Sequence, residues 1–161
     1  MLTNRNISES ILQKMDEIRD GESRLSQAIP PCAIVATSSA LRDELKGYAA
    51  NSSDRVRLIH QALVNLSYLL GQYKNRVIDK LVSNTKEMLT TLDSDQMRDA
   101  LMASCIQTIN DHKITGYTNI VDCAIQLGND ELVTTFQKIL DQEIIASRNL
   151  KTIAAQIQQQ A

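Results

Sequence analysis

The sequence predicts an all-α fold in which two antiparallel helical hairpins are joined by a long crossover that contains a short helix. Apolar residues recur at steps of three and four over four long stretches, which is the spacing of one face of an α-helix. Two short runs of capping residues, one near residue 38 and one near residue 129, would turn the chain inside each hairpin. The chain has only two prolines and five glycines, and this composition also favours helix.

The first helix is expected from about Asn6 to Ala36. Pro30-Pro31 interrupts its pattern and predicts a bend, because a proline removes a helical hydrogen bond. Thr37-Ser38-Ser39 is typical of a turn with a cap for the next helix. One charged residue falls in the apolar stripe, whose members are Ile7, Ile11, Met15, Ile18, Glu22, Leu25 and Ile29.

The second helix is expected from about Ala40 to Leu70, with Gly71 as its stop. Ser52 and Arg55 interrupt the middle of a stripe formed by Leu41, Leu45, Tyr48, Val56, Ile59, Leu63 and Leu66. A connection over about 72–94 follows, and it holds one amphipathic segment whose apolar residues are Val77, Leu81, Met88, Leu89 and Leu92.

Two further helices are expected between Asp95 and Ala161, separated by the stop and cap Gly128-Asn129-Asp130. The third long stripe contains Leu101, Cys105, Ile109, His112, Gly116, Ile120, Cys123 and Leu127. The fourth contains Leu132, Phe136, Ile139, Glu143, Ser147, Leu150, Ile153 and Ile157. Two hairpins with a long crossover have the topology of a ferritin-like four-helix bundle. Gly47 and Gly116 lie inside helices, where we expect them to permit close helix approach.

Composition bounds the class of protein. With 161 residues and 43% apolar content, the chain is expected to form one globular domain over residues 1–161. A net charge of −2 and only five aromatic residues argue against a nucleic-acid partner. The sequence has no signal-peptide pattern and no membrane-length apolar run, so a cytoplasmic protein without a membrane partner is expected, with Cys32, Cys105 and Cys123 reduced.

The charges inside the stripes are predicted to meet in one layer. Glu22 lies as far before Ser38 as Arg55 lies after Ser39, so the two are level in the first hairpin. In the second hairpin the separation from Lys113 to Gly128 nearly equals the separation from Asn129 to Glu143, so Lys113 and Glu143 are level as well. Since charges in a core are costly unless paired, two acids and two bases at one level indicate a buried network.

Several short pieces of sequence resemble the YciE/YciF family of ferritin-like stress-response proteins from about residue 7 to residue 155. Their order and spacing carry the resemblance, and the pieces are Asp20-Gly21-Glu22, Ala28-Ile29-Pro30, Ser38-Ser39-Ala40-Leu41, Ile114-Thr115-Gly116-Tyr117, Leu127-Gly128 and Leu140-Asp141-Gln142-Glu143. The resemblance implies a bundle whose Glu and His side chains converge on a two-metal centre, most often described as di-iron.

Carried over residue by residue, this centre is degenerate. Glu22 and Glu143 match metal-binding acids of the family. Asn51 and Gln142 stand where further Glu residues are usual, and Arg55 stands near a His or Gln position. The Glu-His-x-Glu pattern of the third helix has become Asn110-Asp111-His112-Lys113. These vestigial positions are therefore Glu22, Asn51, Arg55, Asn110, Lys113 and Glu143, with His112 and Gln142 as weaker candidates.

The favoured interpretation is that Arg55 and Lys113 replace the metal charges, so no metal ion, cofactor or catalytic residue is expected. In one alternative both bases extend out to solvent and the acids are only partly buried. In the other, two iron or manganese ions bind, or Glu22, Asp111, His112 and Glu143 hold metal.

Two function classes remain open at this stage. The first is a non-catalytic helical protein, compatible with a homodimer, whose stress-related or interaction role is implied by the resemblance. The second is a metal-binding di-iron carboxylate protein that handles iron or acts as an oxidase. The sequence names no small-molecule substrate, and it contains no phosphate loop, CxxC pair or HExxH motif.

Overall fold

The computed structural model describes residues 3–160, and five α-helices account for most of them. The helices are α1 (Asn4–Val35), α2 (Ser39–Asn65), α3 (Arg76–Leu89), α4 (Asp95–Leu127) and α5 (Asp130–Gln159). Residues 3–160 contain no strand, which confirms the all-α prediction. No helix of the described chain is long and apolar enough to cross a lipid bilayer.

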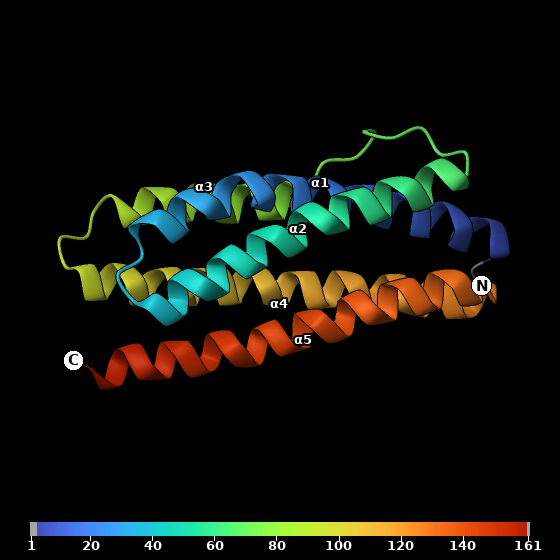
Figure 1. The fold of residues 1–161 in the computed structure, drawn as a ribbon. Helices are drawn as coiled ribbons and strands as arrows, with labels where there is room; N and C mark the ends of the chain where they lie inside the picture. The colour runs from blue at the N-terminus through green and yellow to red at the C-terminus, as the bar shows by residue number, and fades with distance from the viewer. Residues whose placement is uncertain (1–2, 161) are drawn as a thin grey trace.

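The helices pack as two hairpins. α1 packs most extensively on α2, and α4 packs most extensively on α5, while α1 and α4 form the main contact between the hairpins. Figure 1 shows the four long helices running side by side, with α3 and its two loops passing along one side of the molecule. α3 contacts α1 and α4, so the crossover with a short helix is where the sequence placed it.

Each helix is preceded by an N-cap residue whose side chain accepts a hydrogen bond from the backbone N–H three residues later. These residues are Thr3, Ser38, Asn75, Ser94 and Asn129. α4 ends at Leu127, and the residue that caps it, Gly128, has a φ of 67°, a left-handed conformation that glycine adopts without strain. Both hairpin turns therefore lie where the sequence predicted them.

α2 ends at Asn65, five residues before the predicted end at Leu70. Ser67 adopts a left-handed φ of 58° there, and the backbone N–H of Tyr68 donates a hydrogen bond to the Leu63 carbonyl at 3.0 Å. Asp16 of α1 then binds the loop that follows. The buried Asp16 carboxylate accepts hydrogen bonds from the backbone N–H groups of Gly71, Gln72 and Tyr73, at 3.1, 2.9 and 3.1 Å. The Tyr68 hydroxyl donates a further hydrogen bond to it at 3.1 Å. An acid on α1 thus satisfies the backbone of this loop, and the apolar pattern gives no signal of it.

α1 continues through Pro30 and Pro31 and ends at Val35, one residue before the predicted end. The apolar core inside the bundle forms two clusters. One cluster is centred on Leu25, Ile29, Leu41, Leu45, Met102, Ile106 and Leu150. The other is centred on Met15, Ile18, Ile59, Leu63, Tyr117, Ile120 and Phe136.

The two predicted close-approach glycines behave differently. A Cβ atom on Gly116 would lie 3.1 Å from Ile18 Cδ1, so this glycine does allow α1 and α4 to approach. A Cβ atom on Gly47 would meet nothing within 4 Å, so the expectation of close helix packing at Gly47 is wrong within this chain.

Candidate functional site: a buried charge layer

Four charged side chains, one from each long helix, meet between the two apolar clusters. Glu22, Lys113 and Glu143 are 0% exposed, and Arg55 is 3% exposed. Lys113 Nζ lies 2.5 Å from Glu22 Oε1 and 3.0 Å from Glu143 Oε1. The Arg55 guanidinium pairs with Glu143 and lies 4.0 Å from Glu22 Oε2. Each base therefore contacts both acids, and the alternative in which the bases extend to solvent is wrong.

A chain of hydrogen bonds supports the layer from one side. Lys113 Nζ donates to the Tyr48 hydroxyl at 3.1 Å, and that hydroxyl donates to Asn110 Oδ1 at 3.0 Å. Asn110 Nδ2 in turn donates to the Glu143 backbone carbonyl at 2.9 Å. Lys113 Nζ also lies 4.4 Å from the centre of the Tyr48 ring, within the range of a cation–π contact. The network thus fixes the ammonium of Lys113 and the register of α5 together.

Burial determines the proton affinities of the layer. Burial lowers the pKa of Lys113 to about 8, because it removes water from the ammonium. The negative charge of Glu22 raises this pKa again only in part, and the positive charge of Arg55 lowers it further. Burial, together with the charge of Glu22, holds the pKa of Tyr48 and of Tyr117 well above the usual value. Both phenols therefore stay neutral next to two carboxylates.

Several polar atoms of the layer have no hydrogen-bond partner among the described residues. They are both Glu22 carboxylate oxygens, Glu143 Oε2, Arg55 Nε, Ser52 Oγ and the Tyr117 hydroxyl. Glu22 therefore interacts with Lys113 and Arg55 by charge and not through well-oriented hydrogen bonds. Such an acid depends on its cations, since an unpaired buried charge is strongly destabilising.

The sequence reasoning missed Tyr48 and Tyr117 as members of the site. In the sequence Tyr48 reads as part of the apolar stripe of α2, and Tyr117 enters only through the family motif. A signal was available, because a buried tyrosine hydroxyl usually finds a polar partner. A tyrosine within an apolar stripe, close in register to charged residues, is therefore a candidate for the same polar layer.

The remaining predicted positions divide between the layer and the surface. Asn110 is 0% exposed and belongs to the layer. Asn51 and Gln142 are exposed and line a groove of about 270 Å³ between α2 and α5. Gln142 still reaches the layer from outside, because its Oε1 accepts a 3.4 Å hydrogen bond from Arg55.

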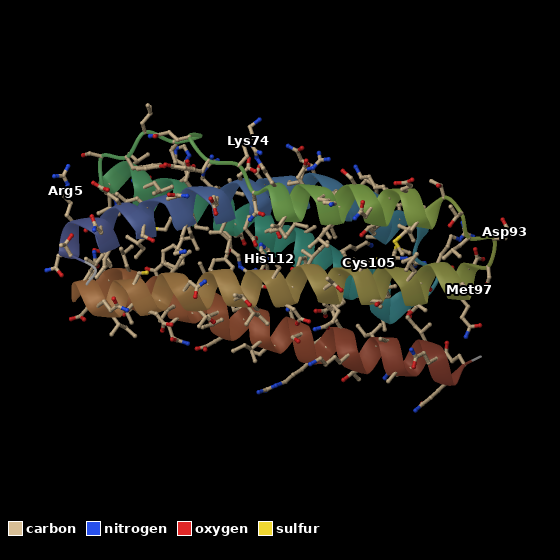
Figure 2. All side chains as sticks on the ribbon, turned by 180° about the vertical axis from the view of Figure 1, so that it is seen from behind. Arg5, Lys74, Asp93, Met97, Cys105 and His112 are labelled. Carbon is tan, nitrogen blue, oxygen red and sulfur yellow. The ribbon has the colours of Figure 1, made fainter. Side chains whose placement is uncertain are left out.

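His112 does not belong to the core stripe, contrary to the sequence prediction. Its side chain is half-buried and lines shallow grooves between α1, α4 and the loop that precedes α3, as its place near that loop in Figure 2 shows. Lys113 occupies the core position instead, one residue further along the helix. Asp111 is exposed and accepts a hydrogen bond from Gln107. The side chains of Glu22, Asp111, His112 and Glu143 therefore do not come together at one metal site.

The donor set of the layer does not fit a two-metal centre. Such a centre uses about four carboxylates with two histidines or further carboxylates, whereas the layer holds two carboxylates. The nitrogen atoms of Lys113 and Arg55 lie against those two carboxylates. No group of three or more His, Cys, Asp or Glu side chains in residues 3–160 is arranged to hold a metal ion.

Comparison with known proteins supports the resemblance seen in the sequence. Protein YciF of Escherichia coli K12 is 18% identical over 151 residues, which cover 93% of this chain and 91% of the relative. The crystal structure described as that of the E. coli stress protein YciF matches over 100% of both chains, with a TM-score of 0.90 and 17% identity. YcfI from Rhodopseudomonas palustris matches with a TM-score of 0.86 and 20% identity, covering 91% of this chain and 93% of its own.

The structural matches show a shared fold at low sequence identity, and the family model covers nearly the whole chain. The model that matches residues 7–161 is that of DUF892, a domain of unknown function. The YciF-like helical protein described here therefore belongs to the DUF892 family.

Proposed function

We propose that this protein is a non-catalytic ferritin-like bundle in which two side-chain cations stand in the place of the metal ions of a di-metal centre. Its role is then stress-related or one of interaction with other molecules, as the description of its relative YciF as a stress protein suggests. The observation that carries the proposal is the position of Lys113 and Arg55, each of which contacts both Glu22 and Glu143.

Charge balance supports the proposal. The two carboxylates and two cations of the layer sum to zero, so the buried network needs no added ion. A divalent cation that entered this layer would lie next to an ammonium and a guanidinium, and only two carboxylates would be there to bind it. Like charges separated by a few ångströms repel each other by several kcal/mol in a protein interior whose effective dielectric constant is about 20.

Metal analysis tests the proposal. Protein purified without chelator and then given Fe(II), Mn(II) or Zn(II) should retain well below one ion per chain after desalting. It should also show no Fe(II)-dependent oxygen consumption. Two ions per chain in the unmodified protein would contradict the proposal and would assign ligand roles to Glu22 and Glu143.

A gain-of-function variant provides the positive control. The combination of Asn51→Glu, Arg55→His, Asn110→Glu and Lys113→Glu replaces both cations and restores the carboxylates that the family pattern implies. This variant should bind metal when the unmodified chain does not. Metal binding by the variant would show that ions can reach the interior of the bundle. The charges of the layer, and not a lack of access, would then be what excludes ions from the unmodified chain.

A further inference from the structure

The connection between α2 and α3 exposes several large apolar side chains. Leu69 is 75% exposed and Val77 is 50% exposed, and Leu66 and Tyr73 are exposed as well. Figure 1 shows this connection passing along the edge of the molecule beyond α1, with no other element outside it. Exposed apolar side chains that gather in one place mark a contact surface, whereas single ones do not. Together with two cations that lie among them, these residues form what we call the crossover edge: Leu66, Leu69, Tyr73, Lys74, Arg76 and Val77.

Contacts from α1 hold the backbone of the crossover edge in place. Asp16 accepts hydrogen bonds from the backbone N–H groups of residues 71–73, and Asp20 accepts one from the Asn75 N–H at 2.8 Å. The chain is anchored again at Ile78, which is buried against α1, where a Cβ atom on Gly21 would lie 2.6 Å from Ile78 Cδ1. A fixed backbone therefore presents the exposed side chains, and a surface that is already ordered loses little conformational entropy when it binds.

The crossover edge is also positively charged. Lys74 and Arg76 are exposed, and neither makes an ion pair with another residue of the described range 3–160. Asp79 is the only acid in the sequence from residue 66 to residue 80, and Arg24 pairs with it at 2.9 Å. Two cations without a protein partner thus lie beside the exposed apolar side chains.

We propose that the crossover edge docks on the surface of a lipid membrane that carries anionic headgroups. In this arrangement Leu69 and Val77 enter the boundary between headgroups and acyl chains, because apolar side chains gain free energy by leaving water. The Tyr73 ring lies at the level of the headgroups, where tyrosine is enriched in membrane proteins. Lys74 and Arg76 meet the lipid phosphates, and each cation near an anionic surface adds to binding.

The surroundings of the crossover edge favour lipid over a folded protein partner. Two grooves of about 420 and 540 Å³ lie beside it, and polar and charged side chains make up most of their lining. The larger groove contains Lys74, Arg76 and His112, with Glu17 as its one acid. A protein contact is usually centred on an apolar or aromatic anchor in a well-packed pocket. Projecting apolar side chains beside a polar, cationic groove instead match acyl chains beside phosphate headgroups.

The proposal rests on the interaction role proposed above and names a partner for it, but it does not depend on the charge layer. The chain lacks a membrane-length apolar run, which predicts no spanning helix, but attachment to a membrane surface needs no such run. The expectation of no membrane partner therefore does not extend to a surface contact. Vesicle binding and metal content are measured separately, so either proposal can fail while the other stands.

Co-sedimentation of the full chain with vesicles tests the proposal. The chain should bind mixed vesicles of phosphatidylcholine and phosphatidylglycerol, and it should bind vesicles of phosphatidylcholine alone at least about tenfold more weakly. Combining Lys74→Glu with Arg76→Glu should weaken binding to the mixed vesicles at least about tenfold, because two attractions become repulsions. Combining Lys138→Glu with Lys151→Glu changes the net charge equally at exposed sites of α5, and this matched control should change binding by at most about threefold.

Apolar insertion is tested at Leu69. Leu69→Asp should weaken binding to the mixed vesicles at least about tenfold, because it removes the most exposed apolar side chain of the crossover edge. Ile34→Asp, at a site of α1 that is 80% exposed, is the matched control and should change binding little. The chain contains no tryptophan, so Leu69→Trp supplies a single reporter whose emission should move to shorter wavelength when mixed vesicles are added. Ile34→Trp should show no such change, and circular dichroism should show the same helix content for all variants.

Failure of the unmodified chain to bind mixed vesicles would overturn the proposal, as would an equal loss of binding in the α5 control. An unchanged Leu69→Trp emission from vesicle-bound protein would show that another face touches the lipid. Sedimentation without lipid distinguishes a protein contact from a lipid contact. If Leu69→Asp changed the mass of the species in solution, the crossover edge would be a contact with a second copy, and the assignment to lipid would be wrong.

Discussion

At the scale of single residues, Lys113 shows how a charge is kept in a core. Its ammonium contacts Glu22, Glu143 and Tyr48, and all four side chains are at most 4% exposed. The sequence predicted Lys113 in the layer because the charged interruptions of two hairpins fell at the same level. Hydrogen-bond partners such as Tyr48 could not be predicted in the same way, since they depend on side-chain directions that register alone does not give.

Removing one charge of the layer should leave its partner stranded. Lys113→Met is expected to lower the free energy of unfolding by about 2–4 kcal/mol, within the range for a broken buried pair. Glu143→Gln should lower it less, because an amide can still hydrogen-bond. Replacing both Lys113 and Glu143 with apolar residues of similar volume should recover much of the loss, because Arg55 and Glu22 remain as a neutral pair.

Urea unfolding of these single and double variants measures the effect. Lys138→Met, which removes an exposed lysine of α5, is the matched control and should change stability by at most about 0.5 kcal/mol. A value that small for Lys113→Met itself would show that the layer does not act as a network.

The lowered pKa of Lys113 predicts an unusual dependence of stability on pH. The folded pKa is about 8, below the ordinary value of 10.5, so between these values the unfolded chain binds more protons than the folded chain. The contribution of Lys113 to the free energy of unfolding should therefore rise as pH increases through this window, by up to about 1.4 kcal/mol per pH unit.

The measurement is urea unfolding from pH 7 to pH 10 for the unmodified chain and for Lys113→Met. Subtracting the two curves removes the contributions of groups that both chains share. Parallel curves would show that Lys113 keeps an ordinary pKa in the folded protein.

At the scale of secondary-structure elements, helix positions followed from the apolar stripes and capping residues, but the end of α2 did not. The stripe of α2 continues past Asn65 in the sequence, whereas the chain turns at Ser67 and the Asp16 carboxylate binds the backbone of residues 71–73. An interaction between residues more than fifty positions apart leaves no periodic trace. The same reason explains why the sequence gives no sign of a structural role for Asp16.

Asp16→Ala should destabilise the protein by about 2–4 kcal/mol, because it leaves three backbone N–H groups and the Tyr68 hydroxyl without their acceptor. Burial alone would raise the pKa of Asp16, but hydrogen bonds from Gly71, Tyr73, Arg19 and Tyr68 outweigh it, and the pKa lies below 3.8. The charge of Asp16 therefore contributes stability above pH 3.8 that is lost as pH falls through the lowered value.

Acid unfolding of Asp16→Asn and of the unmodified chain checks the second point. The difference in stability between them should shrink below pH 3.8. Asp122→Asn, which changes an exposed acid of α4, should follow the unmodified chain throughout. A constant difference across this range would show that the charge of Asp16 is not what holds the loop.

At the scale of the whole molecule, two hairpins are joined by more than their crossover. The Asp99 carboxylate of α4 accepts hydrogen bonds from the backbone N–H groups of Thr37 and Ser38 at 3.0 and 2.7 Å. The turn of the first hairpin is thereby attached to the second. The all-α class and the long crossover could be predicted because each hairpin carries its own turn signals. The attachment through Asp99 could not be predicted, because no sequence pattern links α4 to the turn of the first hairpin.

Asp99→Ala should loosen the first hairpin turn relative to α4. We expect the amide protons of Thr37 and Ser38 to exchange with solvent at least about tenfold faster, since both lose their acceptor and the turn opens locally. Hydrogen exchange followed by NMR measures this at single residues. Exchange at the second turn, near Gly128, serves as the internal control. Equal acceleration at both turns would indicate general destabilisation in place of a local attachment.

The cations of the charge layer belong to the polypeptide itself, and this has a consequence for folding in a changing environment. A fold that a free ion stabilises gains stability by mass action, so its unfolding free energy varies with the concentration of that ion. Lys113 and Arg55 are present at a fixed ratio of one to each chain. The stability that they contribute is therefore independent of metal supply, and a chelator cannot remove it.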